Sequence, residues 1–282
     1  MQPKFHKPTP TIISTTASLL VACSFCVNQA NATVSTVINM TDLGTTADVD
    51  LDSGAGMYSW AINGQDQLQK QWFYSRVGNG LAQPINSIGP ANVLYFNGSN
   101  TLVASYANQQ YTLNISYVLT GGSLGAGSAD ILETISVQNH SGGNLDFHLF
   151  QYSNFDLLGS PLGDSVQFLG LDSVVQKDGI FGIQEGIIQP TATYGEAGFA
   201  GAGGTLDKLT TIAGYNLNNN MGPISGDVTW AFQWDYNIAD GASLDVYKDK
   251  TLIVPVIPEP STLALIALGL GAIAAQGRRR MK

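Results

Sequence analysis

Four aromatic residues alternate along one predicted strand in the last third of the chain. Trp230, Phe232, Trp234 and Tyr236 occupy every second position, so their side chains share one face of an extended strand. A row of rings can stack on the apolar faces of sugars, and it can equally form the core of a β-sandwich. We favour the core interpretation and keep carbohydrate stacking by Trp230 and Trp234 as the alternative.

Three carboxylates stand at alternate positions near the start of the chain, at Asp48, Asp50 and Asp52. Hard oxygen ligands on one face of a strand suit Ca²⁺. The helix–loop–helix calcium motif requires Gly at its sixth position and Glu at its twelfth, where this chain has Ser53 and Ser59. We therefore favour a solvated edge strand whose charges oppose aggregation, and Ca²⁺ binding is the weaker alternative. No other cofactor is expected.

No catalytic constellation stands in a recognisable frame. Carboxylates such as Glu185 and Glu196 supply the residue types of a glycoside hydrolase without its context. His140 and His148 lack the spacing of metal ligands. Residues 33–282 contain no cysteine nucleophile. Residues 121–125 fit Gly-x-Ser-x-Gly by letter, but this glycine-rich run is more simply a flexible hairpin tip than a nucleophile elbow. We therefore expect that the protein is not an enzyme, with a glycoside hydrolase-like activity as the weaker alternative.

The chain ends in three distinct parts, which are Pro258, Glu259 and Pro260, then an apolar run, then Arg278, Arg279 and Arg280. Residues 263–275 are all Leu, Ile, Ala or Gly, and proline cannot continue a helix. A helix over about 261–277 is therefore predicted, and residues 261–276 reach about 24 Å at about 1.5 Å per residue. We expect it to span a membrane with the basic cluster in the cytoplasm. A buried core helix is less favoured, because the run is apolar on all sides.

This tail, over residues 256–282, resembles the PEP-CTERM sorting signal of Gram-negative bacteria. The resemblance implies recognition and cleavage at or near Pro258, Glu259 and Pro260 by an exosortase, a membrane-embedded cysteine transpeptidase. It implies that Arg278, Arg279 and Arg280 act as the stop, and that the helix anchors the protein only until it is processed. It also implies association with the outer surface or with extracellular polysaccharide. Residues 147–157 and 229–234 loosely resemble a body type found ahead of such tails.

The first 32 residues have the features of a secretory signal peptide. A weakly basic start precedes residues 12–27, which carry no charge, and Ala30 and Ala32 form an A-x-A cleavage site. A first core helix, or a lipoprotein signal ending at Cys23 or Cys26, is less favoured. Cys23 and Cys26 both lie in this segment, so the mature chain has no cysteine and no disulfide.

Residues 33–257 hold 6 basic and 20 acidic side chains, a net charge of −14. A strongly acidic domain argues against nucleic acid or an anionic membrane surface as a partner. It is compatible with a neutral or basic matrix.

Period-two hydrophobicity predicts one large all-β domain over residues 33–255, an antiparallel β-sandwich. Gly- and Asn-rich turns separate the predicted strands, which are residues 33–39, 56–63, 68–77, 91–97, 102–107, 111–119, 131–139, 144–154, 165–169, 173–176, 180–184, 227–238 and 243–254. Residues 196–213 differ, with a short helix expected at 205–209.

Two functional hypotheses follow. We favour an exported surface or matrix protein with a structural or adhesive role in polysaccharide or biofilm, sorted by an exosortase. The alternative is a secreted module that binds or cleaves carbohydrate.

Overall fold

The computed structural model describes residues 37–97, 99–123 and 125–254. The predicted signal peptide (1–32) and C-terminal helix (261–277) lie outside these residues. Among the helices that are described, none has the length and apolar character to cross a membrane.

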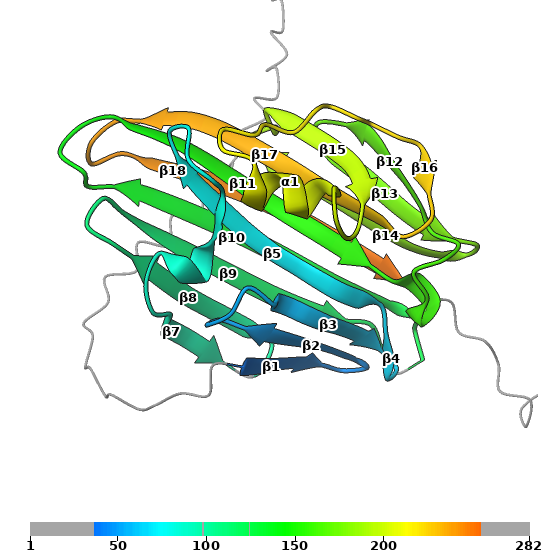
Figure 1. Cartoon of the computed structure of the whole chain (residues 1–282). Helices are drawn as coiled ribbons and strands as arrows, with labels where there is room; N and C mark the ends of the chain where they lie inside the picture. The colour runs from blue at the N-terminus through cyan, green and yellow to red at the C-terminus, as the bar shows by residue number, and fades with distance from the viewer. Residues whose placement is uncertain (1–36, 98, 124, 255–282) are drawn as a thin grey trace, which may run out of the picture. The chain divides into compact units, whose positions relative to one another are not determined.

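Two antiparallel sheets of nine strands each make up the described part of the chain (Figure 1). The first, sheet A, follows the strand order β1–β2–β3–β5–β11–β17–β15, with β4 paired to β3 and β6 paired to β5. Its strands are β1 (Val37–Asp42), β2 (Thr45–Asp50), β3 (Gly56–Ile62), β4 (Gln65–Asp66), β5 (Leu68–Val77), β6 (Gln83–Pro84), β11 (Leu145–Phe155), β15 (Tyr194–Phe199) and β17 (Val228–Ile238).

The second, sheet B, follows the order β16–β12–β13–β14–β18–β10–β9–β8–β7. Its strands are β7 (Asn92–Asn97), β8 (Thr101–Ala107), β9 (Tyr111–Gly121), β10 (Ser128–Asn139), β12 (Ser165–Gly170), β13 (Ser173–Asp178), β14 (Phe181–Gln189), β16 (Ile224–Ser225) and β18 (Ser243–Ile253). The helical elements are η1 (Ile85–Ser87), η2 (Leu157–Gly159) and α1 (Thr205–Thr211).

Aromatic side chains join the two sheets across the core. Phe168 of β12 meets Phe232 of β17 edge to face, with ring centroids 5.0 Å apart. Tyr111 of β9 meets Phe147 of β11 in the same way, also at 5.0 Å. Such contacts add to the burial of large apolar surface, so the sandwich needs no disulfide to hold its layers together.

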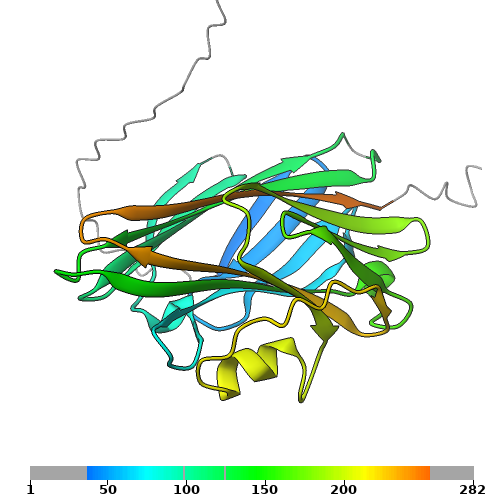
Figure 2. The same ribbon diagram turned by 90° about the horizontal axis from the view of Figure 1, so that it is seen from above.

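The outer faces of the two sheets differ. Strands of sheet B alternate buried and accessible residues, as expected for a sheet with one face in water. The middle strands of sheet A, β5, β11 and β17, are buried on both faces over most of their length. Helix α1 packs against β15 and β17 on the side of sheet A that faces away from sheet B (Figure 2).

The structure confirms the predicted all-β sandwich and the short helix, which extends to residue 211. It corrects the prediction of an edge strand at the aspartates, because β2 lies between β1 and β3 and β1 forms the edge. Strand β15 was not predicted, since glycine has low strand propensity. Gly195 has a packing role there, because a Cβ atom at this position would lie 2.5 Å from the Phe168 ring.

Candidate functional site

The two tryptophans considered for sugar stacking lie inside the sandwich. Trp230 and Trp234 are both 0% exposed. The Trp230 ring stacks on Phe155 with centroids 5.2 Å apart, and the Trp234 indole N–H donates to the Pro190 carbonyl at 2.9 Å. The structure therefore agrees with the core interpretation of the aromatic row, and neither ring is open to a ligand.

The three aspartates considered for Ca²⁺ do not converge. Asp48 accepts a hydrogen bond from the Asn39 amide at 2.6 Å. Asp50 uses both carboxylate oxygens in the turn after β2, accepting from the Asp52 backbone N–H at 3.0 Å and from the Ser53 hydroxyl at 2.5 Å. Within the described ranges, no group of three or more His, Cys, Asp or Glu side chains is placed to hold a metal ion. The residues present do not fit a calcium site.

A charged cluster lies in the centre of the core. Lys248 forms ion pairs with Glu133 and with Glu185, the latter at 3.0 Å, and Lys250 pairs with Glu133. Gln151 on the opposite sheet accepts from Lys248 and donates to Glu185 at 2.7 Å. The two lysines and the two glutamates give the cluster no net charge, and such pairing offsets the cost of removing charged groups from water.

The electrostatics of this cluster favour the ionised state of its central pair. Burial lowers the pKa of Lys248, but the carboxylates of Glu133 and Glu185 outweigh it and the pKa is raised. Burial raises the pKa of Glu185, and the two lysines reverse this and hold it below its usual value. Because these groups are enclosed, they tie β10, β14 and β18 to sheet A and do not contact solutes.

Sequence reasoning missed this cluster although a signal was present. Lys248 and Lys250 are in phase with the buried Val246 and Leu252, and Glu133 is in phase with Ile131. Charged residues at core positions of a period-two pattern indicate a buried ion pair when opposite charges occur on neighbouring strands.

A second polar group lies on the outer face of sheet A. The His148 Nδ1 atom is 2.6 Å from the Asp235 carboxylate, and its Nε2 atom is 3.4 Å from Asp146. Burial raises the pKa of Asp235, and hydrogen bonds from His148 and Gln233 together with the nearby Arg76 reverse this, so the pKa is lowered. An imidazole oriented by a carboxylate is a general acid–base arrangement. His148 is only 9% exposed, so a substrate has little access to it.

Glu196 organises a third group beside α1. Its carboxylate accepts from the Thr205 hydroxyl at 2.8 Å, the Tyr215 hydroxyl at 2.7 Å and the Asn218 backbone N–H at 3.2 Å, and it pairs with Lys208. A polar hollow of about 250 Å³ lies next to it, lined in part by the glycine-rich loop at 198–204. Its volume is below the range of about 300–1,000 Å³ that is usual for small-molecule sites.

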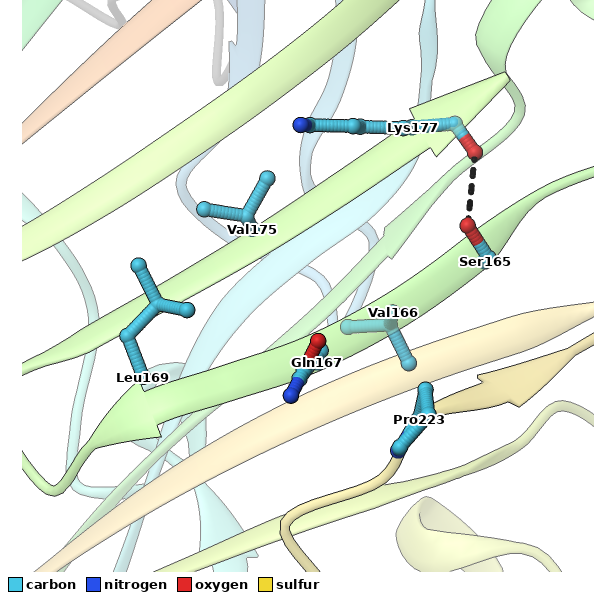
Figure 3. Close-up of a pocket in the computed structure, with 7 residues that line it drawn as sticks. All are labelled: Ser165, Val166, Gln167, Leu169, Val175, Lys177 and Pro223. Atoms are coloured by element: carbon cyan, nitrogen blue, oxygen red, sulfur yellow. Dashed lines mark hydrogen bonds between the residues drawn. The ribbon is translucent and has the colours of Figure 1, made fainter. Parts of the chain in front are cut away.

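A shallow pocket of about 200 Å³ lies on β12 and β13 of sheet B. Figure 3 shows its lining residues, which are Ser165, Val166, Gln167, Leu169, Val175, Lys177 and Pro223. The Ser165 hydroxyl donates to the Lys177 carbonyl at 3.4 Å. Lys177 is the ionisable residue among those that line this pocket.

The predicted sorting and processing residues lie outside the described part of the chain. They are Ala30, Ala32, Pro258, Glu259, Pro260, Arg278, Arg279 and Arg280.

The sandwich is similar to several solved structures. A galactose mutarotase related enzyme from Lactobacillus acidophilus matches with a TM-score of 0.53 and 8% identity, over 77% of this chain and 97% of that one. An Escherichia coli K12 protein considered an aldose 1-epimerase matches with a TM-score of 0.51 and 12% identity, over 79% and 99%. A bacterial glucoamylase solved with acarbose matches with a TM-score of 0.57 and 7% identity, over 80% and 32%.

At these identities the likeness establishes the fold alone: an aldose epimerase-like β-sandwich. A comparison with curated protein sequences finds no match. The tail is more specific, because residues 256–280 match the family model of the PEP-CTERM protein-sorting motif. The predicted sorting signal is thereby confirmed, and the match includes Pro258, Glu259, Pro260 and the three arginines.

Proposed function

We propose that the protein is exported, held in the inner membrane by its tail, processed by an exosortase, and then works at the cell surface or in the extracellular matrix. Its role there is structural or adhesive, in association with polysaccharide. The PEP-CTERM protein-sorting motif at residues 256–280 is the observation that carries this proposal. The acidic, cysteine-free domain supports it, because such a domain needs no oxidative folding and stays soluble.

Fractionation of a culture tests the proposed location. We expect the protein in the washed matrix fraction, and we expect enzymatic digestion of the polysaccharide to release it. A protein that stays in the cytosolic fraction, or that remains with the cells after the polysaccharide is removed, contradicts the proposal.

The second candidate is a secreted module that binds or cleaves carbohydrate. It is supported by the fold, which this chain shares with a mutarotase related enzyme and with about a third of the chain of a glucoamylase complexed with acarbose. The hollow beside Glu196 is the place where such a function would be sought, because His148 is only 9% exposed. Binding to a glycan array or release of sugar by the exported protein distinguishes this candidate, and a negative result in both assays favours the first.

A further inference from the structure

The last described strand stops between two turns at one end of the sandwich. In β18, Ile253 pairs with Gly182 of β14 on one side and with Ser128 of β10 on the other. The next backbone N–H, that of Val254, donates to the Gly127 carbonyl at 2.7 Å. The sorting motif begins two residues further along the chain. We call this end of the sandwich, where β18 stops, the tail end.

Three exposed apolar side chains lie in turns of sheet B and its connections at the tail end. Ile180 is exposed in the turn that joins β13 to β14. Leu158 and Leu162 are exposed in the loop between β11 and β12. That loop lies against the same turn, because a Cβ atom on Gly163 would be 3.2 Å from the Asp178 carboxylate.

Leu43 adds a fourth apolar side chain, from the turn between β1 and β2 of sheet A, and it is also exposed. The carboxylate of the neighbouring Asp42 accepts a hydrogen bond from the Gly121 backbone N–H at 2.8 Å. Gly121 pairs with Ala129 at the start of β10, which places the turn of Leu43 at the tail end. Turns from both sheets therefore present apolar side chains at this end, namely Leu43, Leu158, Leu162 and Ile180.

Two of these leucines have a backbone conformation that bulky residues rarely adopt. The φ angle is +48° at Leu43 and +63° at Leu158. Glycine or asparagine fits such a turn with less strain, and Asn63 does so in the neighbouring turn after β3. A strained backbone that presents an apolar side chain to water is an outlier from which a function can be inferred.

Exposed carboxylates are more numerous in the turns at the opposite end, where they are those of Asp52, Asp146, Asp172 and Asp240. In the turns of the tail end that the structure describes, the exposed carboxylate is that of Asp66, and the others are half-buried or buried. Lys177 adds an exposed positive charge there. An acidic domain is repelled by an anionic surface, and this distribution turns most of the exposed acidic turns away from a surface that meets the tail end.

We propose that the tail end docks on the lipid surface of the membrane that holds the tail, with its four apolar side chains inserted at the headgroup level. The inference rests on the proposed function, in which the tail anchors the protein before processing. From Val254 to the predicted start of the membrane helix at residue 261, the chain reaches at most about 25 Å. The apolar turns are therefore held near the lipid at a high effective concentration, so weak insertion is enough to orient the domain.

Fluorescence quenching on the full-length chain in phosphatidylcholine vesicles tests this inference. Cys23→Ser and Cys26→Ser first remove both native cysteines, so that one introduced cysteine carries the label. Leu162→Cys is the test variant, and Ile188→Cys at the opposite end is its matched control, since the two side chains are 72% and 63% exposed. We expect a nitroxide carried by the lipid to quench the label at position 162 at least threefold more strongly than the label at position 188. Iodide in the water should show the reverse order.

Ile180→Cys, in the neighbouring turn, should behave like Leu162→Cys, so the result does not depend on a single variant. Flotation with the vesicles is measured on the same samples. Equal quenching by the lipid nitroxide at both ends, in a chain that floats with the vesicles, overturns the docking and leaves anchoring by the tail intact. A chain that does not float overturns the docking and contradicts the proposed anchoring as well.

Discussion

The Nζ atom of Lys248 lies 3.0 Å from the Oε1 atom of Glu185, and neither side chain is reached by solvent. Removing one partner of a buried ion pair leaves an uncompensated charge in the core. We therefore expect Lys248→Met to lower the free energy of unfolding by about 3–5 kcal/mol, measured by chemical denaturation. Lys177→Met, at an exposed position, should change it by less than about 0.5 kcal/mol. A loss below about 1 kcal/mol for Lys248→Met would show that the cluster is not electrostatically coupled to folding.

The buried carboxyl group of Asp164 makes the stability of the fold depend on pH. Burial raises its pKa to about 7, the hydrogen bonds from the Leu157 backbone and Gln176 oppose this, and the carboxylates of Asp178 and Asp156 add to it. The folded protein therefore holds this proton more tightly than the unfolded chain, whose Asp pKa is about 3.9. The contribution of Asp164 to stability is full below pH of about 3.9 and falls as the pH rises to about 7.

Asp164→Asn should flatten the decline in stability across this window and raise stability at pH 8. The gain is a few kcal/mol at most, since each unit of difference between folded and unfolded pKa is worth about 1.4 kcal/mol. Thermal unfolding as a function of pH measures the effect, with the exposed Asp172→Asn as the control. A variant whose pH profile follows that of the unmodified protein would refute this account of Asp164.

Two structural features disfavour a side chain at Gly56, the first residue of β3. Its φ is +64°, and an added Cβ would lie 2.3 Å from the ring of the buried Trp72. Gly64 has a φ of +78° with nothing within 4 Å of an added Cβ. A substitution there therefore measures the cost of the backbone conformation alone, without a steric clash. Gly64→Ala should cost about 1–2 kcal/mol, and Gly56→Ala about 1–3 kcal/mol more. Equal losses in chemical denaturation would mean that Trp72 moves aside at no cost.

The fold was predicted well where the sequence alternates cleanly between apolar and polar residues. Strand β5 has the predicted bounds, and α1 begins at the predicted Thr205. Strand β15 was missed because its glycines remove the alternation, and they are there for close packing. Strand β2 was read as an edge because of its aspartates, yet their side chains point away from the core while β1 pairs with its other side.

The candidate sites were less predictable, because a face pattern does not tell which face meets water. The aromatic row of β17 could have been a surface for carbohydrate stacking. Only the position of sheet B shows that these side chains belong to the hydrophobic core. The approach of Lys248 to Glu133 and Glu185 depends on the pairing of β18 with β10 and β14, which local sequence does not specify. The sorting signal could be predicted without knowledge of the tertiary structure, because its three parts are contiguous in sequence.

The arginines of the tail provide the sharpest genetic change for the sorting account. Replacing Arg278, Arg279 and Arg280 together by Ser removes the basic cluster that holds the end of the chain in the cytoplasm. We expect processed protein to fall at least severalfold, measured as the ratio of processed to full-length chain on immunoblots. Lys177→Ser, at an exposed basic residue outside the tail, keeps the tail intact and should leave that ratio unchanged. Normal processing without the arginines would count against their role as the stop.

Mass spectrometry of the exported protein tests the central claim most directly, because it locates both ends of the mature chain. The account predicts an N-terminus at Thr33 and a C-terminus at or near Pro258, Glu259 and Pro260, with the arginines absent. Recovery of an intact chain from Met1 to Lys282 in the cytosol would contradict it.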